Sequence, residues 1–161
     1  MPQGNAAYKI LVIHEYFEPA FKAGGPIRSL ANMVLALKQL YAFEVLCSSH
    51  DLHYEEILPA DKLNTWTRWN NAANVYYHKG SLLSLIRLLQ HSDADVVFIN
   101  GMFSFRYTLL PLFFHRAQKC VLSARGMLKP QALRQKKWKK RAFLFFFRLL
   151  QLHRKVLFHV T

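Results

Sequence analysis

The sequence predicts a doubly wound, Rossmann-like α/β fold, with about six parallel strands in one sheet and helices on both faces. Three observations favour this fold. Short apolar runs alternate along the chain with longer segments whose apolar residues recur at helical spacing. The apolar runs are nearly continuous, as expected of strands that are buried on both faces. The 161 residues, 52% of them hydrophobic, suffice for a single domain with its own core.

Each predicted strand is an apolar run bounded by polar or turn-forming residues. The predicted strands cover residues 8–14, 43–48, 75–78, 95–100, 119–123 and 156–160. Since parallel strands need crossover connections, the segments between them are expected to be mostly helical.

Four helices are predicted between these strands. The first begins at Pro26, whose fixed φ and missing N–H suit a first helical turn. Ser81 is predicted to cap the second helix through its hydroxyl oxygen. The predicted helices cover residues 26–37, 82–90, 104–116 and 130–154. Residues 51–74, which contain Pro59 and several Asn, are expected to be irregular.

Charge is divided unevenly along the sequence. Residues 1–95 contain 8 Lys or Arg and 9 Asp or Glu, whereas residues 96–161 contain 14 Lys or Arg and no acidic residue. We expect the second part to face something negative, because no acid within it neutralises these cations. Nucleic acid, anionic lipid headgroups and substrates that carry a diphosphate all have the required charge.

No segment of the sequence predicts a membrane-spanning helix. The longest late apolar run, 142–152, is interrupted by Arg148 and is shorter than the roughly 20 residues that such a helix needs. Cys47 and Cys120 lie in apolar runs without metal-ligand spacing and are expected to be reduced core residues, with a disulfide between them as the alternative. These features predict a cytoplasmic protein that is able to associate peripherally with the inner face of a membrane.

The loop that contains Gly24, Gly25 and Pro26 follows the first strand and precedes the first helix. In a parallel sheet this order places backbone amides and a helix N-terminus at the carboxyl edge of the strands, where both attract phosphate. The loop is therefore a candidate phosphate site. The alternative is a plain tight turn, because a short glycine motif is weak evidence by itself.

Polar residues follow other predicted strands at the same edge. His14, Asn100, Arg125 and Gly126 are expected to line one cleft, since ligands of open α/β sheets bind at the carboxyl ends of the strands. The guanidinium of Arg125 offers donors for an anion or a sugar hydroxyl. An ordinary surface arginine, and a histidine at position 14 that bonds only to a neighbouring loop, are the alternatives. Gly126 is expected to let the backbone turn.

Two further groups of polar residues are not expected to carry chemistry. The spacing His50-x-x-His53 lacks the third ligand that zinc requires, so we expect no metal site and no bound cofactor. Asp93 and Asp95 are expected to cap and lead into a strand, and they do not make a convincing acid/base pair because one of them precedes the strand at the wrong edge of the sheet.

A basic segment at residues 129–141 has seven Lys or Arg among thirteen residues and leads into the apolar run FLFFFRLL. Basic residues beside aromatic ones suit an anionic membrane or lipid-linked substrate, with a solvated helix face or single-stranded nucleic acid as alternatives. Phe143, Phe147 and Leu150 lie at helical spacing and could pack on the sheet instead. The candidate membrane residues are Lys136, Lys137, Trp138, Lys139, Lys140 and Arg141.

The residues also resemble a known family. The opening KILVIHEYFEPAFKAGGPIRSLANMVLAL is similar to the start of a family-4-type glycosyltransferase of the GT-B fold. The segment VVFINGMFSFRYTLLP resembles the fourth-strand region of that family, and LFHVT resembles the strand that closes its first domain. The most specific likeness is SARGMLKPQALRQKKWKKRAF, in which Arg-Gly-Met-Leu is followed by Lys-Lys-Trp-Lys-Lys.

This resemblance implies a function. Such enzymes transfer a sugar with retention and without a metal, from a nucleotide-sugar co-substrate to a glycan or lipid-linked acceptor in the synthesis of surface polysaccharide or glycolipid. Their first domain binds the acceptor and their second domain holds most of the nucleotide-sugar. By this resemblance, residues 1–161 are a single domain, the N-terminal half of such an enzyme, and lack the C-terminal donor-binding domain.

Carried over residue by residue, the resemblance gives some roles and leaves others open. Gly24 and Gly25 would lie near the donor diphosphate, while Asn100 and Arg125 would line the acceptor side. Many relatives have a histidine where this chain has Asn100, so no catalytic residue is assigned. The chain is expected to be inactive alone.

Two alternative functions were weighed against this one. The first is a non-catalytic, basic Rossmann-like module that binds nucleic acid or an anionic membrane, of which nucleic acid is the less favoured. The second is a dinucleotide-dependent oxidoreductase. It is disfavoured because the first loop lacks G-x-G-x-x-G and no acidic residue ends the second strand.

Overall fold

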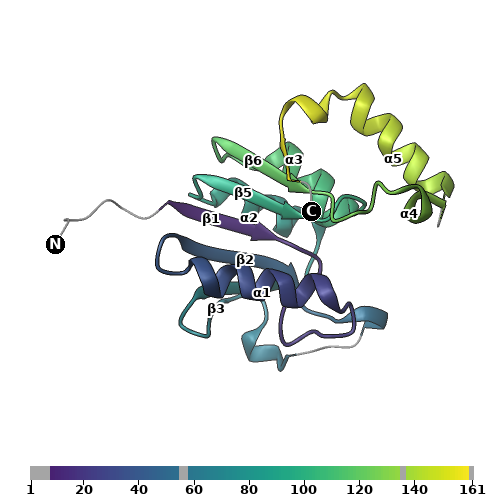
Figure 1. The fold of residues 1–161 in the computed structure, drawn as a ribbon. Helices are drawn as coiled ribbons and strands as arrows, with labels where there is room; N and C mark the ends of the chain where they lie inside the picture. The colour runs from purple at the N-terminus through teal and green to yellow at the C-terminus, as the bar shows by residue number, and fades with distance from the viewer. Residues whose placement is uncertain (1–7, 55–57, 135–136, 160–161) are drawn as a thin grey trace.

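A computed structural model describes residues 8–54, 58–134 and 137–159, which form one sheet with helices on both faces (Figure 1). Seven strands pair in the order β3-β4-β2-β1-β5-β6-β7, and all neighbours are parallel except β3 and β4. This arrangement confirms the predicted doubly wound, Rossmann-like class. The strands are β1 Lys9–Ile13, β2 Ala42–Ser48, β3 Trp66–Trp69, β4 Ala73–His78, β5 Val96–Asn100, β6 Lys119–Ser123 and β7 Leu157–His159.

The sheet divides the hydrophobic core into two layers, and helices cover the layer on each face. Side chains alternate along β1, so that Leu11 and Ile13 enter one core while Val12 enters the other. Residues of α1 pack on the face of Val12, and residues of α2, α3 and α5 pack on the opposite face (Figure 1). The α-helices are α1 Gly25–Leu37, α2 Leu82–His91, α3 Leu110–Phe114, α4 Pro130–Arg134 and α5 Lys137–Leu149.

The two cysteines lie in different layers. Cys47 of β2 belongs to the core beneath α1, whereas Cys120 of β6 belongs to the core on the other face. Both are free and buried, as predicted, and burial raises the pKa of Cys120 to about 12. The two thiols are therefore inert core groups in this structure.

The direction of winding reverses between β1 and β5. The chain leaves β1 through α1 on one face to reach β2, and it enters β5 from α2 on the other face. Neighbouring strands whose connections leave to opposite faces open a crevice at their carboxyl ends, which is where doubly wound folds bind ligands.

The antiparallel strand β3 was not predicted, and the expectation of about six strands falls one short of those in the described residues. Trp66–Trp69 lies in the segment that was expected to be irregular. It pairs with β4 through a hairpin in which Asn70 and Asn71 have φ of 46° and 48°. Asn tolerates this left-handed conformation, and two such residues in succession are typical of a tight hairpin turn.

The helix predicted over 104–116 is shorter and irregular at its start. A π-helical turn, Phe105–Leu109, precedes α3. Pro111 explains the difference, since its ring would clash with the carbonyl four residues earlier in a continuous α-helix and it has no N–H to donate. The Ser104 hydroxyl accepts from the Tyr107 amide at 3.2 Å and so fixes the beginning of the turn.

The single helix predicted over 130–154 is also wrong. The described residues form α4 before and α5 after residues 135–136, and α5 ends before Gln151, whose φ of 51° is left-handed and cannot continue a helix. A short 3-10 segment, Leu152–Arg154, then leads to β7. Residues 135–136, including Lys136 of the predicted basic surface, and the end of the predicted last strand at Val160 lie outside the described residues.

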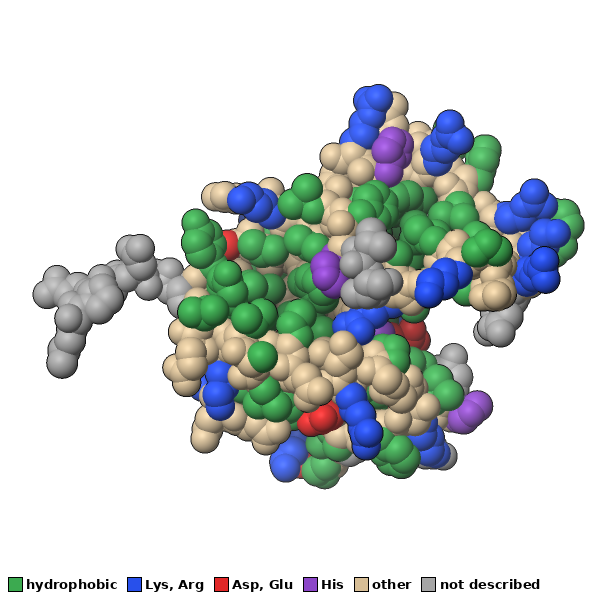
Figure 2. All heavy atoms as spheres, viewed as in Figure 1, with side chains coloured by type: hydrophobic (Ala, Val, Ile, Leu, Met, Phe, Trp, Pro, Cys, Tyr) green, Lys and Arg blue, Asp and Glu red, His purple; other side chains and the backbone are tan. Residues whose placement is uncertain are grey.

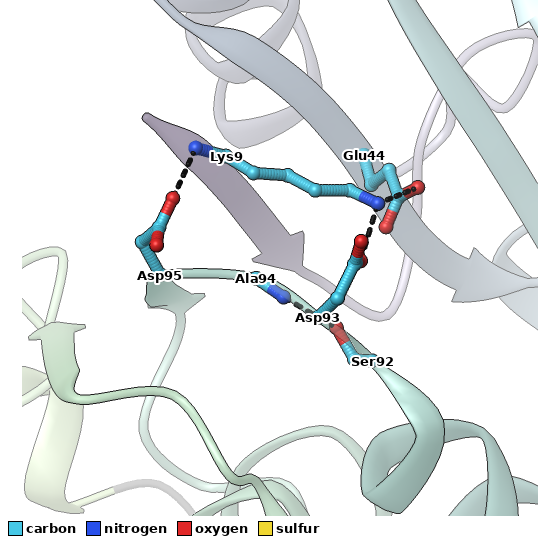
Figure 3. Close-up of polar contacts among 6 residues, drawn as sticks. All are labelled: Lys9, Glu44, Ser92, Asp93, Ala94 and Asp95. Carbon is cyan, nitrogen blue, oxygen red and sulfur yellow. Dashed lines mark hydrogen bonds and ion pairs between the residues drawn. The ribbon is translucent and has the colours of Figure 1, made fainter. Parts of the chain in front are cut away.

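A cluster of charges closes the amino edge of the sheet (Figure 3). The Lys9 ammonium lies 2.8 Å from Glu44 and 2.5 Å from Asp93, while the Lys9 backbone amide donates to the Asp95 carboxylate at 2.8 Å. Asp93 and Asp95 therefore both contact Lys9, the first residue of β1. They lie at the amino edge of the sheet, opposite the edge where the cleft was expected.

Candidate functional site

Arg125 joins three segments of the chain at the carboxyl edge of the sheet. Its Nε donates to Asn100 Oδ1 at 2.6 Å, and its Nη1 donates to Ser29 Oγ at 2.9 Å. Asn100 ends β5, Ser29 lies in α1, and Arg125 itself follows β6. Arg125 and Gly126 have φ of 49° and 66°, so both take the left-handed conformation in which the chain turns back over the edge.

His14 follows β1 beside Asn100. Its side chain is buried, and burial lowers the pKa of His14 to about 4. A hydrogen bond between the ring and the Asn100 backbone partly opposes this shift, whereas the charge of Arg125 adds to it. His14 is therefore neutral at physiological pH, and its ring has one donor and one acceptor nitrogen.

A small hollow opens between the ends of β1 and β5, with a volume of about 110 Å³. Two buried polar atoms, His14 Nε2 and Asn100 Nδ2, have no hydrogen-bond partner among the described residues, and both belong to residues that line this hollow. Buried polar groups are nearly always hydrogen-bonded, so each unpaired atom needs an explanation. Other lining residues are Glu15, Gly101, Met102, Ser104 and Thr108.

Gly24 and Gly25 lie at the same edge but line a different and larger hollow, of about 680 Å³. Gly24 has φ of 72° and precedes α1 without a side-chain cap. A Cβ built on either glycine would meet no atom within 4 Å, so the packing of the protein gives no reason for the missing side chain of Gly25. The space in front of the α1 N-terminus is open.

The predicted cleft residues therefore gather at one edge, although not in a single hollow. The structure brings His14, Asn100 and Arg125 into contact or adjacency, and the bond from Arg125 to Ser29 ties them to the first turns of α1. Sequence reasoning missed Ser29. Its position one helical turn after Gly25, on a helix that starts at this edge, was the available signal.

Asp51, also missed, holds the glycine loop in place. Its buried carboxylate accepts hydrogen bonds from the backbone amides of Phe21 at 2.8 Å, Lys22 at 3.1 Å and Leu52 at 2.7 Å. Burial by itself would raise the pKa of Asp51, but these amides and the Lys22 charge outweigh it and lower the pKa. The loop thus approaches α1 with its amides satisfied by one ionised side chain.

Asp51→Ala is expected to lower the free energy of unfolding by about 2 kcal/mol, because it removes the one acceptor of three backbone amides. Urea denaturation at neutral pH measures the loss. The matched control is Asp61→Ala, which removes an exposed carboxylate elsewhere in the same region and should change stability by less than about 0.5 kcal/mol. If the two variants lose the same free energy of unfolding, Asp51 does not hold the glycine loop in place.

Helix α5 carries two apolar stripes. Phe143 and Phe147 face the body of the protein, where Phe143 packs on Phe103 and Phe147 packs on Phe158. Leu150, which the alternative interpretation packs on the sheet with them, is instead 49% exposed. A second stripe, which we call the α5 outer stripe, points away from the core. It consists of Trp138, Phe145 and Leu149, which are 81%, 62% and 62% exposed.

The predicted basic residues that the structure describes lie in the first half of α5, beside Trp138 of this stripe. Lys137, Lys139 and Arg141 are exposed, and Figure 2 shows Lys and Arg side chains gathered over α4 and α5. Lys140 is different, because its ammonium bonds the Ala132 carbonyl at 2.6 Å and lies 5.1 Å from the centre of the Phe103 ring. None of the helices within the described ranges combines the length and the apolar character that crossing a membrane demands.

Within the described residues, no group of three or more His, Cys, Asp or Glu is arranged to hold a metal ion. His50 Nδ1 lies 3.2 Å from the Asp51 carbonyl. His53 has φ of 69° in a short 3-10 turn.

Comparisons of the chain with protein-family models, curated proteins and solved structures found no match. What the structure shows is the Rossmann-like fold and the gathering of polar residues at one edge of its sheet. The resemblance to glycosyltransferases stays a prediction, and it enters the functional argument only as a proposal.

Proposed function

We propose that this domain binds the acceptor for a retaining glycosyltransferase, which moves a sugar from a nucleotide-sugar to a glycan or lipid-linked acceptor. The observation that carries the proposal is the bridge made by Arg125, which bonds Asn100 and Ser29 at the winding reversal. Doubly wound folds bind ligands at this point. The donors of arginine suit sugar hydroxyls and phosphate oxygens alike.

The glycine loop supports a role beside the diphosphate of the donor. Gly25 begins α1 and leaves open space in front of the helix N-terminus, where the dipole favours an anion. The proposed division of roles is an acceptor side at His14, Asn100, Arg125 and Gly126, and a diphosphate side at Gly24 and Gly25. A second domain, facing this edge, would hold the rest of the nucleotide-sugar.

Glycan binding tests the proposal. The 161-residue chain is titrated with neutral oligosaccharides and their lipid-linked forms, and binding is followed by calorimetry. Arg125→Ala is expected to weaken binding about tenfold or more, since a hydrogen bond from a charged group contributes at least about 1.4 kcal/mol. The control is Arg116→Ala, an exposed arginine just before β6 at the other edge.

Two outcomes of this titration would overturn the proposed function. One is a failure of every glycan to bind. The other is an equal effect of Arg125→Ala and Arg116→Ala, which would place the binding elsewhere.

A separate expectation concerns catalysis. The 161 residues alone should show no multiple turnover with nucleotide-sugars and acceptors, because the loop amides supply only part of the charge stabilisation that the leaving diphosphate needs.

A second candidate function is favoured by the acid-free charge of residues 96–161. A basic module that binds nucleic acid would also use such a surface. Oligonucleotides and anionic vesicles, compared over a range of salt concentrations, separate the two. A steep salt dependence with preference for the oligonucleotide would favour this module, while preference for vesicles fits an enzyme that works at the inner face of a membrane.

A further inference from the structure

We propose that the hollow between β1 and β5 binds a hydroxyl group, which donates a hydrogen bond to His14 Nε2 and accepts one from Asn100 Nδ2. The inference rests on the proposed function in taking the bearer of this hydroxyl to be the acceptor. Its evidence is independent of the resemblance, because it comes from two buried polar atoms that have no partner within the described part of the chain and that belong to residues lining one hollow.

The amide of Asn100 has a fixed direction. Arg125 can only donate hydrogen bonds, so the atom of Asn100 that lies 2.6 Å from Arg125 Nε must be the carbonyl oxygen. The amide nitrogen therefore points away from Arg125. It belongs to a residue that is only 2% exposed, and none of the described residues offers it an acceptor. Asn100 thus presents an unused donor.

The surroundings of the His14 ring assign its tautomer. Its Nδ1 side lies against the Asn100–Gly101 backbone, to which the ring is hydrogen-bonded, while Nε2 has no partner among the described residues. The only acceptor of the Asn100 backbone is its carbonyl oxygen, so Nδ1 carries the proton. In a neutral ring Nε2 then presents a lone pair, and the low pKa of His14, about 4, keeps the ring neutral. His14 thus presents an unused acceptor.

A donor and an acceptor in one hollow select the chemistry of the ligand. A carboxylate or phosphate oxygen only accepts, so it would satisfy Asn100 and oppose the lone pair of His14. An ammonium group only donates, so it would satisfy His14 and oppose the Asn100 amide. A hydroxyl group does both. The site therefore favours an alcohol over either charged group.

The size of the hollow limits what enters it. Its volume, about 110 Å³, corresponds to roughly four water molecules in the liquid. A hydroxymethyl group or one edge of a sugar ring fits this space, whereas a complete sugar does not. The remainder of the ligand would lie outside the hollow, beside the partly exposed Glu15 that lines it.

Nuclear magnetic resonance tests the inference on the ¹⁵N-labelled 161-residue chain. The Asn100 side-chain amide and the His14 ring nitrogens are followed during separate titrations with 1,2-ethanediol, sodium acetate and methylammonium chloride. We expect saturable shifts of both groups with the diol alone. Asn100→Asp keeps an oxygen for Arg125 but replaces the donor with an acceptor, and should raise the half-saturation concentration, read at His14, about tenfold or more.

Two variants complete the experiment. Asn71→Asp makes the same chemical change on the exposed hairpin and should leave the diol titration unchanged. His14→Phe should also weaken diol binding, measured by the chemical shift of the Asn100 side-chain amide. This variant tests the site if Asn100→Asp does not fold.

The inference is overturned if the diol gives no saturable shift up to molar concentrations, if acetate or methylammonium shifts both groups equally well, or if the Asn100 and His14 variants bind the diol as the unmodified chain does. If the diol binds while no glycan does, the proposed function fails and this site remains.

Discussion

Replacing Trp138, Phe145 and Leu149 together with Ser is expected to weaken binding to anionic vesicles by about a hundredfold. These residues form the α5 outer stripe and are more than half exposed. Burial of a large apolar side chain contributes about 1.5 to 3 kcal/mol when it is complete. Partial insertion of three side chains, at about 1 kcal/mol each, thus gives roughly the 2.7 kcal/mol that corresponds to a hundredfold.

Co-sedimentation with phosphatidylglycerol vesicles measures this loss. The control variant replaces Tyr8, Leu40 and Leu83, which are similarly exposed outside α5, with Ser. It should bind as the unmodified chain does. If both triple variants bind equally well, the stripe is not a membrane contact. Since the inner residues Phe143 and Phe147 are untouched, both variants are expected to fold.

The charges around the stripe should act in the same direction. Glu substitutions at Lys136, Lys137, Lys139 and Lys140 are expected to release the chain from anionic vesicles, because each basic residue near such a surface contributes about 1 kcal/mol. Lys140 should account for the smallest share, since its ammonium already bonds the Ala132 carbonyl. When the variants are measured singly, Lys139→Glu should therefore weaken vesicle binding more than Lys140→Glu does. If the quadruple variant still binds the vesicles, the membrane role is refuted.

The parallel strands were predictable because burial on both faces leaves an uninterrupted apolar run, as in the VVFIN of β5. Strand β3 escaped prediction for the opposite reason. Its sequence WTRW has only four residues, alternates between exposed and partly buried positions, and contains the charged Arg68, so it leaves no continuous apolar run. Only the hairpin partner in β4 makes it a strand, and pairing between segments is not encoded in the local pattern.

Helix α5 shows a second limit. Apolar residues lie on two of its faces, and helical spacing alone does not tell which face meets the sheet. Phe143 and Phe147 were correctly expected to pack, while Leu150 was not correctly placed. The left-handed Gln151 directly after it turns the chain, so that Leu152 enters the core in its place.

The candidate site was predictable in position but not in its connections. The rule that ligands bind at the carboxyl edge of the strands selects His14, Asn100 and Arg125 from the sequence. The bond from Arg125 to Ser29 depends on the left-handed backbone at Arg125, which brings the side chain across to α1. An arginine in that conformation is uncommon, and no sequence pattern announces it.

Acid is expected to destabilise the protein between pH 6.5 and pH 4, through two buried histidines. The pKa of both His14 and His78 is lowered to about 4, mainly by burial, and the charge of Arg106 contributes to the shift of His78. An unfolded histidine binds its proton near pH 6.5. In the interval between these values the unfolded chain therefore holds more protons than the folded chain, and stability falls as the pH falls.

The size of this effect follows from the two pKa values. One pH unit corresponds to about 1.4 kcal/mol for each histidine, so the change from pH 6.5 to pH 4 is on the order of 3 kcal/mol for each. Urea denaturation at several pH values measures it. The effect reaches its full extent near pH 4, below which the folded histidines are protonated too and carboxylates such as Asp51, whose pKa is also lowered, take over.

The double variant His14→Gln, His78→Gln separates histidines from carboxylates. Glutamine has a polar side chain that does not titrate, so the free energy of unfolding of this variant should vary much less between pH 6.5 and pH 4. Below pH 4 its loss of stability should match that of the unmodified chain, because Asp51 is present in both. Parallel curves over the upper interval would mean that neither histidine is held neutral by the fold, and the lone pair on His14 would no longer be available to a ligand.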